Sequence, residues 1–410
     1  MTVKRLIAIY ATQLSLHWGL YAILFPVQVL LMLSRGVDML DVGILIAVVS
    51  ATTFLLEVPT GTLADQMGRK KIYFWSLVAQ GVAFIAFLYS QHFWHLVIGV
   101  VALGVARALA TGTLDAWFVE KLKQVDRHYP LDKAMAWVSG VMTLALGGVT
   151  LGAGLLPSFP VGLSSPYDLN IVVGLGMIPV VAIYTWVFIK ESPSPHHHGD
   201  LVKALRQFPT MLSASVQLIR RPAMSILMTT MAFAGFAYFA IENFWQPQLT
   251  LLMSDPVKQS WWLGLTAACF FGANALGNLL FPLVSDRLAW PSKWIMVLAF
   301  WGVGVTMVFV GWQGQFIGFL VLYSCHTLFW GIGEPAYERL FHERVPDHLR
   351  SSLTSSQSLV MQTGGVLGAL GLGALADATS VALAWSLAGA IFLASGLLFI
   401  RLDENRDKTV

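Results

Sequence analysis

The chain has 410 residues, of which 56% are hydrophobic and 11% are charged, with a net charge of +3 and a mean hydropathy of +0.69. Because a soluble globular protein carries about 25% charged residues, this composition excludes a water-soluble domain and indicates that most of the chain lies in a lipid bilayer. The net charge is small, and the sequence contains no basic patch that would favour nucleic-acid binding.

The chain divides into apolar segments of about 20 residues, the length that crosses a bilayer as an α-helix. The first segment follows Met1–Arg5 and lacks a small-residue cleavage site, so we expect a spanning helix and no removed signal peptide. The predicted spans are 6–33, 42–64, 72–90, 94–120, 133–156, 168–190, 222–252, 260–285, 293–312, 315–341, 351–376 and 380–400. The sequence therefore predicts an all-α membrane protein with twelve transmembrane helices.

The basic residues are distributed unevenly between the loops. All but three of the 25 Lys and Arg residues lie in or beside the N-terminus, the even-to-odd loops and the C-terminus. Arg35, Lys258 and the intramembrane Arg107 are the exceptions. Since cytoplasmic loops carry such an excess of positive charge, we expect a multi-pass protein of the cell membrane with both termini in the cytoplasm.

The chain contains an internal repeat. A shift of 221 residues places Gly43 on Gly264 and Asp65 on Asp286, and parallel copies of a six-helix unit are a known transporter architecture. The predicted organisation is an N-terminal six-helix bundle (1–190), a cytoplasmic linker with an amphipathic segment (191–221), a C-terminal six-helix bundle (222–401) and a cytoplasmic tail (402–410). Three histidines in the linker, at 196–198, could bind a metal or serve as a polar spacer; we expect no metal and no cofactor.

Residues 61–71 form a polar stretch between two predicted spans and read Gly-Thr-Leu-Ala-Asp-Gln-Met-Gly-Arg-Lys-Lys. This stretch resembles the signature loop between helices 2 and 3 of the major facilitator superfamily of transporters, Gly-x-Leu-Ala-Asp-Arg-x-Gly-Arg-Lys, and departs from it only at Gln66. The resemblance, which extends to the twelve-helix drug–proton antiporters, implies two pseudo-symmetric six-helix bundles that the loop latches together on the cytoplasmic side. The gate residues that it implies, with their partners in the second copy, are Gly61, Asp65, Gly68, Arg69, Asp286 and Arg287.

We expect Gly61 to permit close approach of the eleventh helix. Asp65 would lie near the N-terminus of that helix, at Ser351-Ser352, where backbone N–H groups favour a carboxylate. Arg69 would hold Asp65 in place. The second copy of the motif is incomplete, because Pro282 stands in the position of Gly61.

Four predicted helices carry polar residues at intervals of about four, which places them on one helical face. Charges at membrane depth cost about 2.5 to 3.5 kcal/mol on insertion scales, so we expect them to face a cavity or a partner. In the resembled family, helices 1, 4, 7 and 10 line the central cavity, which implies that these residues face the substrate path. The candidate proton- and substrate-binding residues are His17, Tyr21, Arg107, Asp115, Tyr238, Glu242, Trp245, His326, Trp330 and Glu334.

The acids among these residues have two possible roles, because a carboxyl group in an apolar cavity can bind a proton or balance a cation. We expect Asp115, Glu242 and Glu334 to bind protons or cations, and Arg107 to act on an acid of a neighbouring helix. The aromatic side chains on the same helices would suit lipophilic cations. The alternative is that these polar residues only lock helix packing.

No phosphate-binding Gly loop, Cys-x-x-Cys pair or His-Glu-x-x-His motif is present in the sequence, so we expect a transporter and not an enzyme. The predicted function is proton-coupled export of amphipathic, cationic compounds by a monomer whose partners are a small-molecule substrate, protons and the lipid bilayer. Two alternatives are proton-coupled transport of a small polar metabolite, and a lipid flippase or non-transporting sensor on the same fold. The span 133–156 lacks the internal Gly-Pro pair that drug–proton antiporters of the family often carry.

Overall fold

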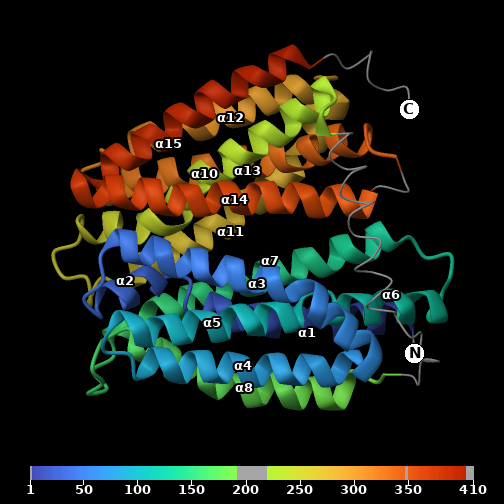
Figure 1. Ribbon diagram of the computed structural model, residues 1–410, viewed down its shortest axis with the longest axis horizontal. Coiled ribbons are helices and arrows are strands. Elements are labelled where there is room, and N and C mark those ends of the chain that lie inside the picture. Colours follow the sequence, from blue (N-terminus) through green and yellow to red (C-terminus); the bar gives the residue numbers. More distant parts are fainter. Residues whose placement is uncertain (1, 192–218, 347–349, 403–410) are drawn as a thin grey trace. The chain divides into compact units, whose positions relative to one another are not determined.

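The computed structural model describes residues 2–191, 219–346 and 350–402. Within these residues all regular secondary structure is helical (Figure 1). The three histidines of the predicted linker, most of its amphipathic segment and nearly all of the predicted tail lie outside the described residues. The all-α fold that the composition predicts is confirmed.

The chain forms two compact units. Unit 1 comprises Met1–Val37, Val48–Lys203 and Asp255–Ala268, and unit 2 comprises Asp38–Ala47, Ala204–Ser254 and Cys269–Val410. Each unit therefore contains most of one predicted six-helix bundle together with a short segment from the other half of the sequence.

Unit 1 is built around α1 and α4. Its helices are α1 (Val3–Ala22), α2 (Gln28–Leu33), most of α3 (Met39–Met67), α4 (Arg69–Leu88), α5 (Phe93–Ala110), α6 (Thr113–Val125), α7 (Leu131–Leu155) and α8 (Asp168–Phe188). A short 3-10 turn, η1 (Leu156–Ser158), follows α7. Helix α4 packs against α5 and α8, and α1 packs against α7.

Unit 2 is built around α10 and α12. Its helices are α10 (Pro222–Thr250), most of α11 (Trp261–Pro282), the π-helical η2 (Leu283–Arg287), α12 (Ser292–Val310), α13 (Phe316–His342), α14 (Arg350–Ala378), α15 (Val381–Gly396) and the 3-10 segment η4 (Leu397–Arg401). Helix α10 packs against α14 and α15, and α12 packs against α13 and α15.

Eleven of the described helical segments are long and apolar enough to cross a membrane. The one predicted span that is not among these eleven is the first, which corresponds to α1, a helix of 20 residues. The first predicted span, 6–33, was too long as one helix, because the chain leaves the α-helical conformation between α1 and α2. Pro26 lies in this break, where its missing N–H and its ring remove one helical hydrogen bond and weaken the helix.

The fourth predicted span is also broken, between α5 and α6. Gly112 has a φ of +72°, in the left-handed region that glycine adopts without strain. The chain continues as one candidate span, Phe93–Val125, but its helical hydrogen bonding is interrupted at Thr111 and Gly112. The prediction that Arg107 and Asp115 share one continuous helical face was therefore wrong.

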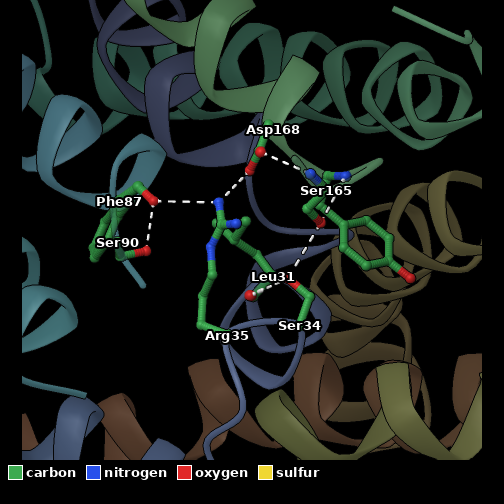
Figure 2. Close-up of polar contacts among 8 residues, drawn as sticks. Leu31, Ser34, Arg35, Phe87, Ser90, Ser165 and Asp168 are labelled. Atoms are coloured by element: carbon green, nitrogen blue, oxygen red, sulfur yellow. Dashed lines mark hydrogen bonds and ion pairs between the residues drawn. The ribbon is translucent and has the colours of Figure 1, made fainter. Parts of the chain in front are cut away.

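A buried ion pair holds three elements of unit 1 together (Figure 2). Arg35, just after α2, pairs with Asp168, the first residue of α8, and their side chains are 7% and 1% exposed. The Asp168 carboxylate also accepts a hydrogen bond from the backbone N–H of Ser165 at 2.9 Å. Arg35 donates to the carbonyl of Phe87, on α4, at 3.4 Å. The sequence analysis identified Arg35 only as a basic residue in a loop on the side of the membrane that carries few bases. It did not predict that Asp168 is its partner.

Candidate functional site

A cavity of about 280 Å³ lies inside unit 2, among α10, α12, α13 and α14. Tyr238 and Trp330 form one aromatic wall, with ring centroids 4.8 Å apart. The remaining wall is mostly apolar and rich in methionine. The lining residues are Met231, Tyr238, Met296, Ala299, Phe300, Trp330, Gly333, Glu334, Tyr337, Glu338, Gln357 and Met361. Such a pocket can hold a flat apolar group beside a carboxylate.

Glu334 is the acidic residue at this cavity that the sequence predicted. Its side chain is exposed, and no ion pair joins it to a base within the part of the chain that the structure describes. The carboxamides of Asn278 and Asn274, on α11, lie beside its carboxylate. Tyr238 lies within electrostatic range of both Glu334 and Glu242. The structure therefore brings together four of the predicted residues of unit 2: Tyr238, Glu242, Trp330 and Glu334.

Two other predicted residues of unit 2 lie in its packed interior. Trp245 is fully buried, with its ring 5.7 Å from that of Tyr323. His326 is 1% exposed and packs edge-to-face on Tyr323 at 4.7 Å. Neither ring nitrogen of His326 has a hydrogen-bond partner among the described residues. Neither residue lines the cavity.

The predicted residues of unit 1 form a second cluster, centred on Tyr21. The guanidinium of Arg107, on α5, lies 5.3 Å from the centroid of the Tyr21 ring. The ring of His17 lies 5.6 Å from that of Tyr21, one turn earlier on α1. The hydroxyl of Tyr21 is buried and has no partner among the described residues. The four-residue spacing on α1 predicts that His17 and Tyr21 lie together, and the structure adds Arg107 beside Tyr21.

Asp115 has a hydrogen-bond partner that the sequence analysis did not name. The hydroxyl of Tyr10, on α1, donates a hydrogen bond to the Asp115 carboxylate, and the Tyr10 ring stacks on Phe118 at 4.3 Å. Tyr10 was missed by the sequence analysis, although it lies seven residues before His17 and so on the same face of α1. An aromatic hydroxyl one or two turns from a polar row was the signal that could have identified it.

The predicted gate of unit 1 is a one-residue junction between two helices. The prediction of a loop over 61–71 was wrong, because residues 61–67 continue α3 and residues 69–71 begin α4. Gly68 makes the turn alone, with a φ of +100° that glycine adopts without strain. A Cβ added at Gly61 would meet no heavy atom within 4 Å.

Charged side chains surround this junction. Arg69 pairs with Glu120, at the end of the fourth span, with Nη1 and Oε1 3.1 Å apart. The side chain of Asp65, its predicted partner, lies outside what the structure describes, as do those of Ser351 and Ser352.

Helices α4 and α8 cap one another beside the gate. The backbone N–H of Arg69, the first residue of α4, donates to the Glu191 carboxylate at 2.8 Å. The Lys70 ammonium donates to the carbonyls of Trp186 and Ile189, at the end of α8, at 2.9 and 2.8 Å. An acid at a helix N-terminus and a base at a helix C-terminus each satisfy groups that lack intrahelical partners. The motif therefore fixes helix ends within unit 1, a role that the sequence analysis did not predict.

The second copy of the gate has a different structure. Asp286 and Arg287 lie in the π-helical η2, and both are exposed. The only hydrogen bond recorded for the Asp286 carboxylate within the described part of the chain comes from the hydroxyl of Ser285, at 2.6 Å. Nothing at η2 corresponds to the turn at Gly68.

No cluster of three or more His, Cys, Asp or Glu residues able to hold a metal occurs within the described ranges 2–191, 219–346 and 350–402. Cys269 and Cys325 are half-buried and unpaired. The cavity of unit 2 therefore offers carboxylates, aromatic rings and carboxamides. The cluster of unit 1 offers a guanidinium, an imidazole and a phenol.

Comparison with known proteins identifies the fold. A family model described as Major Facilitator Superfamily matches residues 9–255. The multidrug efflux pump Tap of Mycobacterium tuberculosis is 23% identical over 380 residues, which cover 88% of this chain and 85% of Tap. An uncharacterized MFS-type transporter of Bacillus subtilis, YxaM, is 24% identical over 235 residues; that match covers 55% of this chain and only 54% of YxaM.

Solved structures give the same fold. A point mutant of the nucleoside transporter NupG superposes with a TM-score of 0.79 at 11% identity, over 96% of this chain and 99% of NupG. The unmutated NupG gives a TM-score of 0.74 at 14% identity, over 96% and 98% of the two chains.

Proposed function

The chain belongs to the major facilitator superfamily of transporters, and we propose that it is a proton-coupled exporter of amphipathic, cationic compounds. The observation that carries this proposal is the cavity of unit 2, where the Glu334 carboxylate lies with the rings of Tyr238 and Trp330. A lipophilic cation gains attraction from a carboxylate and from the faces of aromatic rings, and methionines adapt to varied shapes. The likeness to Tap supports an exporter of this class.

The proposed proton carriers are Glu242, Glu334 and Asp115. One carboxylate can hold a proton or balance a cationic substrate, but it does not do both at once, so the two ligands compete. Protons that enter from outside would neutralise these acids and release the substrate. Return of the empty transporter would then deliver the protons to the cytoplasm, by the alternating access that such repeats perform. Arg107 would modulate this exchange.

Dye transport in everted membrane vesicles tests the proposal. Energised vesicles with the wild-type protein should accumulate ethidium, and the double variant Glu242→Gln, Glu334→Gln should lower the rate at least tenfold. Glu343→Gln is the matched control, because it removes an exposed acid beyond the end of α13. Unchanged transport by the double variant would refute the assignment of these acids.

A small polar metabolite is the second candidate substrate class. The carboxamides of Asn274 and Asn278 beside Glu334 offer the donors and acceptors that a polar substrate needs. A thermal-shift panel of cationic dyes, nucleosides, sugars, amino acids and lipids, at two pH values, separates the candidates. Stabilisation by a nucleoside or sugar, lost in Asn278→Leu and kept in Glu334→Gln, would favour the polar metabolite. Binding without flux would indicate a sensor, and binding of lipids alone would indicate a flippase.

A further inference from the structure

Arg107 is a cation at membrane depth whose guanidinium has no ion-pair partner among the described residues. It lies near the middle of the candidate span Phe93–Val125, and its side chain is exposed. Among the described residues, no carboxylate lies within ion-pair distance of its guanidinium. The acid nearest to it in the same span, Asp115, is hydrogen-bonded by Tyr10. Because a charge at this depth is unfavourable without a partner, an anion supplied by a ligand would complete the site.

A buried chain of hydrogen bonds ends at His17, close to Arg107. The hydroxyl of Thr185, on α8, lies 3.0 Å from Oε1 of Gln13 and 2.7 Å from the carbonyl oxygen of Val181, and donation to Gln13 gives the chain described next. Nε2 of Gln13 donates to the hydroxyl oxygen of Tyr73, on α4, at 3.0 Å. That hydroxyl lies 3.1 Å from Nδ1 of His17. Gln13, Tyr73 and Thr185 are at most 1% exposed, so water does not compete for these bonds.

The direction of this chain determines where His17 carries its proton. Since the Tyr73 oxygen accepts from Gln13, its single proton is donated to Nδ1 of His17. A neutral imidazole whose Nδ1 accepts carries its proton on Nε2. Protonating Nδ1 as well would leave the buried Tyr73 hydroxyl without an acceptor, which is costly. The chain therefore favours neutral His17, with an Nε2–H donor available to a ligand.

We propose that Arg107 and His17 form a subsite of unit 1 that binds an anionic oxygen, such as a carboxylate of the transported compound, and that Thr185, Gln13 and Tyr73 position His17 as its second donor. The Arg107 guanidinium and the His17 imidazole both contact the Tyr21 ring. Together they supply the hydrogen bonds, one of them charge-assisted, that a carboxylate requires. The inference rests on the proposed transport function and refines it. Preferred substrates would carry a carboxylate in addition to a cation.

Three xanthene dyes separate the two charges. Rhodamine B carries a cation and a carboxylate, its ethyl ester carries the cation alone, and fluorescein carries a carboxylate without the cation. Binding is measured with the purified full-length protein in an uncharged maltoside detergent, which contains no lipid phosphate. We expect rhodamine B to bind about tenfold tighter than its ester, as expected for a charge-assisted hydrogen bond. Arg107→Gln should abolish this preference.

The controls keep the inference separate from the proposed function. Arg127→Gln removes an exposed base in the α6–α7 loop and should leave the preference unchanged. Equal affinity for the acid and the ester would overturn the inference while leaving the cation exporter intact. Fluorescein binding that depends on Arg107, with no binding of either rhodamine, would support the subsite and refute the cationic substrate. If none of the three dyes binds, both proposals fail.

The position of the His17 proton has its own measurement. In ¹⁵N-histidine spectra, with His17 assigned by comparison with His17→Gln, Nδ1 should give an unprotonated signal and Nε2 a protonated one. Tyr73→Phe should lower the carboxylate preference about threefold and mix the two tautomers, without changing ester binding. The hydrogen bonds could also run in the opposite direction. The Gln13 carboxamide would then be rotated by 180°, Thr185 would donate to the carbonyl of Val181, and Nδ1 of His17 would donate to Tyr73, which would give the opposite signals. That result would overturn the role of His17.

Discussion

The two units place a glycine at the same position of the repeat but use it for different reasons. With the two-residue slip that aligns the fourth helix of each half, Gly112 corresponds to Gly331. Gly112 has a φ of +72° and open space around it, and it breaks the helix. Gly331 lies inside the continuous α13, where an added Cβ would come within 2.3 Å of the carbonyl oxygen of Asn274, on α11. One glycine provides a backbone conformation, and the other permits close helix contact.

The side chains of the candidate site residues also differ between equivalent positions of the two units. At three of the four equivalent positions the two units carry different chemical groups, and at the fourth both carry a carboxylic acid. The equivalent pairs, with unit 1 first, are His17 and Tyr238, Tyr21 and Glu242, Arg107 and His326, and Asp115 and Glu334. The repeated helix positions thus carry mostly different side chains, because duplication copies helix positions while each copy of the sequence diverges separately.

The largest expected difference between the two units is in the free energy of unfolding that is lost when an ion pair is broken. Asp168→Asn leaves the buried Arg35 without its partner, which should lower the free energy of unfolding by about 3 to 5 kcal/mol. Glu343→Gln, in the solvent-exposed pair with Arg339 of unit 2, should cost less than about 1 kcal/mol. Thermal unfolding in detergent measures both effects.

A double variant separates the unpaired charge from lost packing. Replacing Arg35 and Asp168 together by leucine should recover most of the stability, because no buried charge then remains. Equal destabilisation by Asp168→Asn and Glu343→Gln would contradict the difference in burial on which the comparison depends.

The equivalent glycines give the next effect. Gly331→Ala should destabilise by about 2 to 3 kcal/mol, since the backbone of α11 would have to move. Gly112→Ala should cost about 1 to 2 kcal/mol, because alanine is strained at a positive φ. Asparagine tolerates the left-handed region, so Gly112→Asn should be milder than Gly112→Ala, whereas Gly331→Asn should be worse than Gly331→Ala. The opposite order in unfolding temperature would show that Gly112 is needed for space.

The two gate copies give the smallest effect. The family resemblance predicts that Asp65→Asn shifts the transporter toward the inward-facing state, by about fivefold if one favourable helix-terminus interaction of roughly 1 kcal/mol is lost. Asp286→Asn should have little effect, because the second copy of the motif is incomplete. Distances between spin labels on the cytoplasmic ends of the helices measure the populations. Equal shifts by both variants would mean that the copies act alike, and no shift by Asp65→Asn would refute the gate.

The polar rows illustrate how far the sequence could predict the site. The four-residue spacing on α1 correctly placed His17 and Tyr21 together, because residues of one continuous helix keep a fixed angular relation. The same argument failed for Arg107 and Asp115, since Gly112 breaks the helix between them. Spacing predicts a shared face only where the helix is unbroken, and a single glycine in an apolar run does not reveal whether it turns or packs.

The sequence by itself determined that this chain is a helical membrane protein of the major facilitator type. Hydropathy, charge asymmetry and the 61–71 motif are local properties, so they can be recognised from the order of the residues alone. Only the tertiary structure decided the partners: Arg35 with Asp168, Tyr10 with Asp115, and Glu334 beside Tyr238. The physical reason is that burial in lipid constrains each helix separately, whereas a pairing depends on how helices far apart in the chain rotate and pack against one another.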